Sequence, residues 1–171
     1  VFGETGEEET QEMCRFPTEL DVDGILLSPG YHYEALEGDD HFLFRDEIHA
    51  KFTKIVELSK RYKKISSTPL FLQFAAGQRD YPCTPWGNPT YTPKGWKGPC
   101  YLIEGKYYGS WKDFFGGVDW DYWESRRDPK CHNCKMHSGF EASVVRKLGE
   151  KPADALTLLR WQVQDVRNRT S

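Results

Sequence analysis

The pattern of apolar positions in the first third of the chain predicts alternating extended and helical segments. Val1-Phe2 has the character of a strand end, and a helix is expected from about residue 6 to residue 19, interrupted or kinked at Pro17. The apolar run Ile25-Leu26-Leu27 is typical of a strand covered on both faces. A long helix is then expected from about residue 40 to residue 64. This alternation predicts parallel strands joined by right-handed crossovers.

Local signals support both helices. Thr5 and Glu8 have the spacing of a capping box, with Thr5 as the N-cap. Apolar positions on the long helix form one stripe. Basic residues in its last turn complement the negative end of the helix dipole, and we prefer this explanation of the basic run to a nucleic-acid-binding patch. The stripe consists of Phe44, Ile48, Phe52, Ile55, Ser59 and Tyr62, and the basic residues are Lys60, Arg61, Lys63 and Lys64.

From about residue 65 the chain changes character. The segment 66–77 predicts a short helix, with Pro69 near its first position and Gly77 just past its end. Gly, Pro and aromatic residues follow, and 101–108 predicts a β-hairpin turning at Glu104-Gly105. Ser110 is expected to cap another short helix.

The C-terminal part predicts two more helices. The first runs from Gly139 to about Leu148, with Val144, Val145 and Leu148 buried. The second begins near Pro152, and its apolar stripe is Leu156, Leu159, Val163 and Val166. The chain therefore divides into residues 1–64, a Cys-rich extension 65–150 and a terminal helix 151–171.

Composition limits the classes of partner. A net charge of -3 over 171 residues gives no argument for nucleic-acid binding, and no apolar run could span a membrane. Without a visible signal peptide we expect a cytoplasmic protein. The chain opens at Val1 without Met, so we expect the C-terminal part of a longer protein; the alternative is a boundary within an exposed loop. An aromatic cluster is either the core of the extension or a contact with a membrane interface. Its members are Trp111, Phe114, Phe115, Trp120, Tyr122 and Trp123.

Five cysteines supply the candidate chemistry. Cys14 lies among core positions of the first helix, where a cysteine usually acts as a small buried hydrophobe. Cys83 and Cys100 flank a Gly- and Trp-rich stretch, and Cys131 and Cys134 form a CxxC pair. Each of these four lies in or beside a loop, which predicts that their thiolates converge on one inorganic centre.

Two occupants suit four thiolates: a structural zinc ion and an iron–sulfur cluster. Zinc ribbons generally carry two CxxC knuckles and this chain has one, which favours the cluster. A disulfide is weaker, because the chain has no export signal and can bury a core. His137 extends the pair to CxxCxxH and is an alternative ligand, although four cysteines already complete a ligand shell.

Several motifs occur in an order that resembles a known family. They are DGILLSPGYHYE, PLFLQFAAG, CTPWGNPT, GWKGPCYLI and CHNCKMHSGFEASVV, within residues 23–145. They resemble the C-terminal half of the radical S-adenosylmethionine (SAM) adenosyl-hopene transferases of hopanoid biosynthesis. The resemblance covers most of residues 1–150, and CTPWGNPT and CxxCxxHSGFE are its most specific segments.

The resemblance implies an α/β fold, namely the last βα units of a partial (β/α) barrel followed by a small α+β Cys-rich extension with a β-hairpin. It implies an enzyme that adds a 5′-deoxyadenosyl radical from SAM to a hopene, giving adenosylhopane. Its partners would be the triterpene substrate and an electron donor protein, and the substrate would be reached through an apolar cavity or, alternatively, through peripheral contact with a membrane. Cys83, Cys100, Cys131 and Cys134 would ligate an auxiliary [4Fe-4S] cluster by analogy with other radical SAM enzymes. Ser28, Pro29, Gly30 and Tyr31 end a predicted barrel strand, and either line the SAM or substrate pocket or merely terminate the strand.

Two departures limit what the resemblance implies. The CxxxCxxC motif that holds the SAM-cleaving cluster is absent from this sequence, so no activity is expected of this chain alone. Some relatives carry a cysteine beside the histidine, where this chain has Ser138, which leaves the ligand set open. A related radical SAM enzyme with another substrate and a non-catalytic, zinc-stabilised module are the alternative functions.

Overall fold

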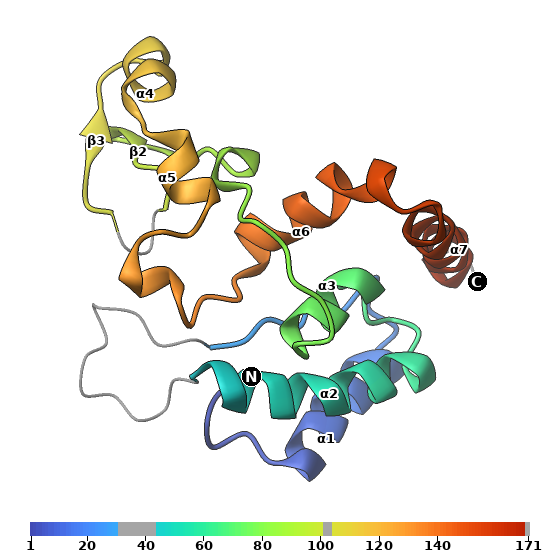
Figure 1. The fold of residues 1–171 in the computed structure, drawn as a ribbon. Coiled ribbons are helices and arrows are strands. Elements are labelled where there is room, and N and C mark those ends of the chain that lie inside the picture. Colours follow the sequence, from blue (N-terminus) through green and yellow to red (C-terminus); the bar gives the residue numbers. More distant parts are fainter. Residues whose placement is uncertain (31–43, 101–103, 170–171) are drawn as a thin grey trace.

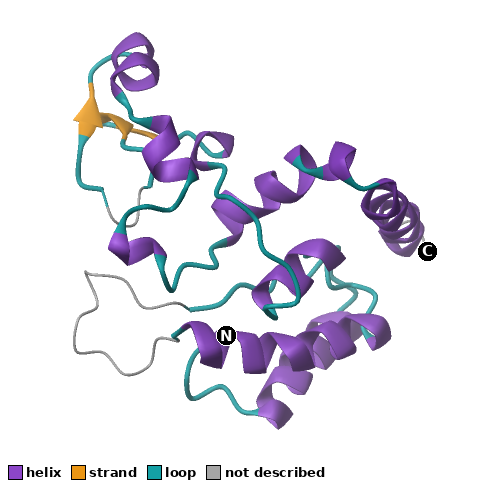
Figure 2. Ribbon diagram, in the orientation of Figure 1, coloured by secondary structure: helices purple, strands orange, loops and turns teal. Residues whose placement is uncertain are grey.

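The computed structural model describes residues 1–30, 44–100 and 104–169, and helices make up most of it (Figures 1 and 2). The helices are α1 (Glu7–Glu19), α2 (Arg45–Arg61), α3 (Pro69–Ala75), α4 (Trp111–Gly117), α5 (Trp120–Glu124), α6 (His137–Arg146) and α7 (Pro152–Arg169). Three single turns of 3-10 helix are η2 (Pro85–Gly87), η3 (Pro129–Cys131) and η4 (Leu148–Glu150). The strands are β1 (Tyr91–Thr92), β2 (Gly95–Lys97) and β3 (Tyr107–Tyr108).

The first helix matches its predicted range but not its predicted cap. Gly6 is the N-cap residue of α1, and because glycine has no side chain it makes no side-chain capping bond. The Thr5 hydroxyl instead accepts a hydrogen bond from the backbone N–H of Phe2, at 3.0 Å. The prediction of Thr5 as N-cap is therefore wrong, because this hydroxyl closes the preceding turn. Pro17 lies inside α1, which ends two residues later.

Helix α2 ends at Arg61, earlier than the end predicted near residue 64. It begins at Arg45, and the prediction that it starts near residue 40 falls in a range that is not described. Ile48, Phe52 and Ile55 are fully buried, as their spacing predicts. Phe44 precedes the helix and is exposed, so it does not belong to the buried stripe.

Extended segments lie in parallel beside these helices. Ile25 forms a parallel bridge with Ile65, in which Ile25 N donates to Lys64 O at 2.7 Å and Ser66 N donates to Ile25 O at 2.9 Å. On the other side, Gly30 N donates to Val1 O at 2.7 Å. The expected strand is thus a single bridge, and it is not covered on both faces, since Leu26 is 55% exposed while Leu27 is buried. The partial barrel remains a prediction.

Helix α3 has the predicted boundaries for the predicted reasons. The Thr68 hydroxyl accepts a hydrogen bond from Phe71 N, and Pro69 occupies the first turn, where its missing N–H costs nothing. Gly77 follows the helix with φ +74°, a conformation that suits glycine. Five apolar side chains of α3 are buried: Leu70, Phe71, Leu72, Phe74 and Ala75.

The small sheet is antiparallel, in the order β1-β2-β3. Strand β3 pairs with β2, through Trp96 opposite Tyr108 and Lys97 opposite Tyr107. The predicted partner of this strand, residues 101–103, lies outside the described residues. Strand β2 was not predicted. Gly95 has φ +108°, and a Cβ there would lie 2.5 Å from Tyr108 O.

One buried core joins the N-terminal helices to the Cys-rich part. The rings of Phe74 on α3 and Phe140 on α6 lie 4.2 Å apart between centroids. Val144 is buried beside them as predicted, but Val145 is 63% exposed, because consecutive helical side chains point about 100° apart and this one faces solvent. The core therefore crosses the predicted division at residues 64/65.

Helix α7 lies at the end of the molecule opposite the sheet (Figure 1). It packs on the core through Leu158 rather than through its apolar stripe. Leu156, Leu159, Val163 and Val166 are all exposed. Across the described ranges, none of the helices combines the length and the apolar character needed to cross a bilayer.

Candidate metal centre

Cys83, Cys100, Cys131 and Cys134 line one pocket. The pocket contains about 600 Å³ of space, part of it open to solvent, and its remaining wall is mostly apolar. The apolar residues include Pro85, Pro99, Trp123, Met136 and Phe140. The four described cysteines form no cystine with one another, and their convergence on one inorganic centre remains a prediction.

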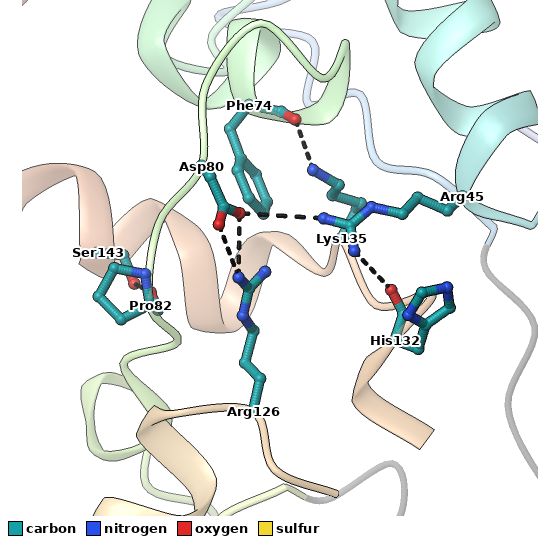
Figure 3. Close-up of polar contacts among 8 residues, drawn as sticks. All are labelled: Arg45, Phe74, Asp80, Pro82, Arg126, His132, Lys135 and Ser143. Atoms are coloured by element: carbon teal, nitrogen blue, oxygen red, sulfur yellow. Dashed lines mark hydrogen bonds and ion pairs between the residues drawn. The ribbon is translucent and has the colours of Figure 1, made fainter. Parts of the chain in front are cut away.

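The backbone around Cys83 is held from two sides. Cys83 N donates to Glu124 O at 3.0 Å, and Thr84 N donates to Gly139 O at 3.1 Å. The Ser143 hydroxyl of α6 lies 2.7 Å from Pro82 O, a contact drawn in Figure 3, and 2.8 Å from the Thr84 hydroxyl. These bonds fix the Cys83 loop on α5 and α6.

The CxxC pair occupies a tight turn between η3 and α6. The Asp128 side chain caps η3 by accepting from Lys130 N at 2.9 Å. Cys134 N donates to Cys131 O at 3.1 Å, which closes the turn and turns both thiols toward the same pocket. Pro129 at the first position of η3 favours this single helical turn.

Cys100 is carried by the small sheet. Gly98 N donates to Lys106 O at 2.8 Å, which extends the β2–β3 ladder by one step beyond the strands. Pro99 then directs the chain away from the ladder, and Cys100 O accepts from Glu104 N at 2.9 Å. The sheet thus brings the widely spaced Cys100 to the pocket.

The environment of the pocket raises the pKa values of two of its thiols, those of Cys83 and Cys131. Burial raises the pKa of the Cys83 thiol, and the neighbouring Cys134, Cys100 and Cys131 raise it further. The pKa of Cys131 rises to about 12, mainly through burial and then through Cys134 and Cys100. Arg126 lines the pocket and opposes both shifts, because its positive charge favours a thiolate.

Charged residues brace the pocket from the side of α2 and α3 (Figure 3). Asp80 binds Arg126 through both carboxylate oxygens, at 3.1 and 2.9 Å, and lies 3.9 Å from Arg45. Arg45 also donates to His132 O inside the CxxC turn, at 3.0 Å. Arg126 has φ +57°, which is uncommon for a residue with a side chain. These residues have no local signal in the sequence, since their contacts join segments far apart in the chain.

Lys135 lies directly after Cys134 and is buried. Its Nζ donates to Phe74 O at 2.9 Å and lies 3.7 Å from the centre of the Phe74 ring (Figure 3). Burial and the nearby Arg45 lower the pKa of Lys135 to about 8. The lysine therefore anchors the CxxC turn to the C-terminal end of α3, where carbonyl groups and the helix dipole favour a cation.

Gly139 is a further residue that sequence reasoning did not single out as part of the site. A Cβ at this position would lie 2.7 Å from Cys83 Sγ, closer than a carbon and a sulfur can approach. The first turn of α6 thus leaves space for the Cys83 thiol only because residue 139 has no side chain. The signal available in the sequence is a glycine within the first turn of a helix, where it weakens the helix.

The alternative ligand His137 lies outside the pocket lining among the described residues. Its Nδ1 lies 3.1 Å from the Ser28 hydroxyl. Ser28, buried Pro29 and Gly30 are near this histidine and do not line the thiol pocket. Tyr31, the fourth residue expected to line a SAM or substrate pocket, lies outside the described residues.

A single zinc ion bound by four cysteine thiolates fixes the distance between their sulfurs. Tetrahedral zinc with Zn–S bonds of about 2.3 Å needs sulfurs about 3.8 Å apart. Within residues 1–30, 44–100 and 104–169, no three Cys, His, Asp or Glu side chains are gathered to hold one metal ion. The four thiols nevertheless line a common pocket.

Comparison with known proteins places the chain in a family without assigning a function. Neither the curated proteins nor the solved structures give a match to it. Residues 25–158 match the family described as Domain of unknown function (DUF3463), and this range includes all four cysteines of the pocket. Because the match extends over most of the sequence, the chain belongs to the DUF3463 family.

Proposed function

We propose that Cys83, Cys100, Cys131 and Cys134 hold a [4Fe-4S] cluster in the C-terminal portion of a radical SAM enzyme. The observation that carries this proposal is the convergence of four thiols, from three separate segments, on one mostly apolar pocket without a disulfide. Four cysteines are the usual ligand set of such a cluster. The resemblance to adenosyl-hopene transferases supplies the class of enzyme.

The cysteine pattern favours a cluster over a single zinc ion. Zinc ribbons generally carry two CxxC knuckles, whereas this chain has one, and its other two cysteines, Cys83 and Cys100, flank a loop. Four cysteines that line one pocket can each bind a different iron of a cluster.

When bound, a cluster of this type supplies one-electron transfer. The protein's own contribution is to bind and to shield it. Phe140 and Trp123 form part of the apolar wall of the pocket, which limits the access of water to it. Arg126, held by Asp80, supplies a positive charge that offsets the thiolates.

For the complete reaction we propose the adenosylation of a hopene, with SAM as the radical source and an electron donor protein as partner. The CxxxCxxC motif that would hold the SAM-cleaving cluster is absent from this sequence, so that cluster needs residues from elsewhere. The proposal places the enzyme in the cytoplasm, where thiols stay reduced. Ser28, Pro29, Gly30 and Tyr31 stay candidates for lining a SAM or substrate pocket.

The test is to prepare the chain without oxygen, reconstitute it with iron and sulfide, and measure iron, sulfide and zinc together with the absorption spectrum. We expect a brown protein with about four iron atoms per chain. Single Cys→Ala variants at the four pocket positions should lose most of this iron. The matched control is Cys14→Ala, because Cys14 is buried outside the pocket and its loss should leave the iron content unchanged.

The second candidate function is a non-catalytic module in which the same thiolates bind zinc. The observation in its favour is the tight CxxC turn, which Cys134 N closes by donating to Cys131 O. A colourless protein with one zinc per chain, and no iron after reconstitution, would establish this reading and refute the cluster. Conversion of SAM to 5′-deoxyadenosine by this chain alone would contradict our assignment of that step to residues outside it.

A further inference from the structure

Arg126 brings a positive charge into the lining of the thiol pocket. Apart from the four cysteines, every other described side chain of this lining is uncharged. The Arg126 side chain is only 20% exposed, and its guanidinium carbon lies 5.8 Å from the centre of the Phe140 ring, which belongs to the same wall. Because little water separates this charge from the pocket, its field there is weakly screened.

The backbone at Arg126 is one that a long side chain rarely adopts. Arg126 follows helix α5, which ends at Glu124, and its φ is +57°. Its N–H donates to Trp123 O at 3.1 Å and so closes the end of the helix. In this position glycine is usual, because any larger side chain strains the left-handed backbone. The chain thus carries a long cation where the backbone alone would favour glycine, and strain of this kind is concentrated at functional sites.

Asp80 holds the guanidinium group in place. Both of its carboxylate oxygens accept from the same nitrogen of Arg126, at 3.1 and 2.9 Å (Figure 3). The Asp80 side chain is 64% exposed, so water and salt screen its negative charge more than they screen the charge of Arg126. Arg45 lies 3.9 Å from the same carboxylate. The ion pair therefore leaves a net positive field at the pocket, contributed by its more buried member.

Two further charged residues lie close to the cysteines. Burial and the neighbouring thiols are the largest causes of the raised pKa of Cys131, and Asp128 adds to them, whereas Arg126 opposes them. Lys135 is outside the lining of the pocket, and its Nζ donates to Phe74 O at 2.9 Å. Arg126 is thus the described cation that is placed to act directly on whatever the four thiolates hold.

We propose, resting on the [4Fe-4S] cluster proposed above, that Arg126 raises the reduction potential of this cluster and that Asp80 limits the rise. A cluster that accepts one electron from its donor gains one negative charge and takes up no proton. A nearby cation therefore favours the reduced state, and a nearby anion opposes it. A purely structural ion pair would behave differently, because removing either member breaks the same bonds and would change the site in the same way.

The test is a redox titration of the whole reconstituted chain with dithionite in the absence of oxygen, in which electron paramagnetic resonance follows the reduced cluster. Arg126→Asn removes the charge and introduces a residue that tolerates a positive φ. At a fixed potential, the ratio of reduced to oxidised cluster should fall roughly tenfold, which is a shift of about 59 mV for one electron. Asp80→Asn should shift the potential in the opposite direction and by less, because this carboxylate is exposed.

Two matched controls separate the local charge from net charge and from folding. Arg160→Gln removes an exposed arginine of α7 and should leave the potential unchanged. Arg126→Lys keeps the positive charge and should stay close to the potential of the unchanged chain. Circular dichroism and iron and sulfide analysis of every variant verify the fold and the cluster before potentials are compared. If Arg126→Asn does not retain iron, the rise in potential of Asp80→Asn decides the test.

Two outcomes would overturn the role of Arg126 and leave the cluster assignment intact. The first is that Arg126→Asn and Asp80→Asn shift the potential in the same direction or not at all, which would make the pair structural. The second is that Arg160→Gln shifts the potential as much as Arg126→Asn does, which would make the effect one of net charge. An unchanged chain that binds zinc and no iron would instead refute the proposed function, and the role of Arg126 with it.

Discussion

Ser143 connects the core to the candidate metal centre, and its substitution by alanine gives the sharpest test of how the Cys83 loop is held. The side chain is fully buried on α6. Its hydroxyl proton is within reach of Pro82 O, at 2.7 Å, and of Gly139 O in its own helix, at 2.9 Å, and its oxygen can accept from the Thr84 hydroxyl, which is also buried. Alanine removes these contacts. Gly139 O keeps Thr84 N as a donor, whereas Pro82 O and the Thr84 hydroxyl lose this partner.

The expected magnitude follows from these two contacts. A net hydrogen bond stabilises a protein by about 1 kcal/mol, and a buried polar group left without a partner costs about 1–3 kcal/mol. We therefore expect Ser143→Ala to lower the free energy of unfolding by about 2 kcal/mol. In urea, the midpoint of unfolding should fall by roughly 1 M for a chain of this size.

The assay is urea unfolding followed by circular dichroism, with Ser59→Ala as the control. Among the described residues, the Ser59 hydroxyl bonds only to Val56 O within its own helix, at 2.8 Å, so its loss should change stability by less than about 0.5 kcal/mol. Combining Ser143→Ala with Thr84→Val should cost less than the sum of the single changes, because the variants share one interaction. The reasoning is refuted if Ser143→Ala is no more destabilising than the control.

Two more predictions concern backbone conformation and a buried acid. Gly77→Ala should lower the free energy of unfolding by about 1–2 kcal/mol, because φ is +74° and the new Cβ would lie 2.8 Å from His49 Nδ1. The control is Gly116→Ala, which adds a Cβ in open space on α4 and should be neutral or stabilising in the same urea assay. Burial raises the pKa of Glu141, despite opposing hydrogen bonds from Thr68, so its contribution to stability is present below the ordinary glutamate pKa of about 4.3 and is lost as pH rises through the folded-state value. Glu141→Gln should therefore become more favourable relative to the unchanged chain from acid to neutral pH in urea titrations; a difference independent of pH would contradict this.

The helices could be predicted from the sequence because their signals are local. Thr68, Pro69 and Gly77 fix the start and end of α3 through bonds and dihedral angles within a few residues. Ser110 likewise caps α4, by accepting from Asp113 N at 3.1 Å. One exception was α5, for which the sequence analysis predicted no helix. Another was the start of α1, where the Thr5 hydroxyl had a competing backbone donor, and spacing alone cannot rank two such donors.

Sheet pairing and burial could not be predicted in the same way. Strand β2 is a strand because Gly95 lets its backbone approach β3, and that approach depends on a partner ten or more residues away. The stripe of α7 has the right period but is exposed, since period identifies a face and only packing decides whether a neighbour covers it. The same reasoning applies to Val145 on α6.

For the candidate site, the sequence determined which side chains carry the chemistry: four cysteines in loops, with a spacing that suggested a shared centre. Only the tertiary structure brought them to one pocket, and only it revealed Arg126, Asp80 and Gly139 as the residues that set its charge and space. The physical reason is that a residue's chemistry and its nearest hydrogen bonds are local, whereas the position of a thiol, the charge beside it and the room around it depend on every segment that packs there.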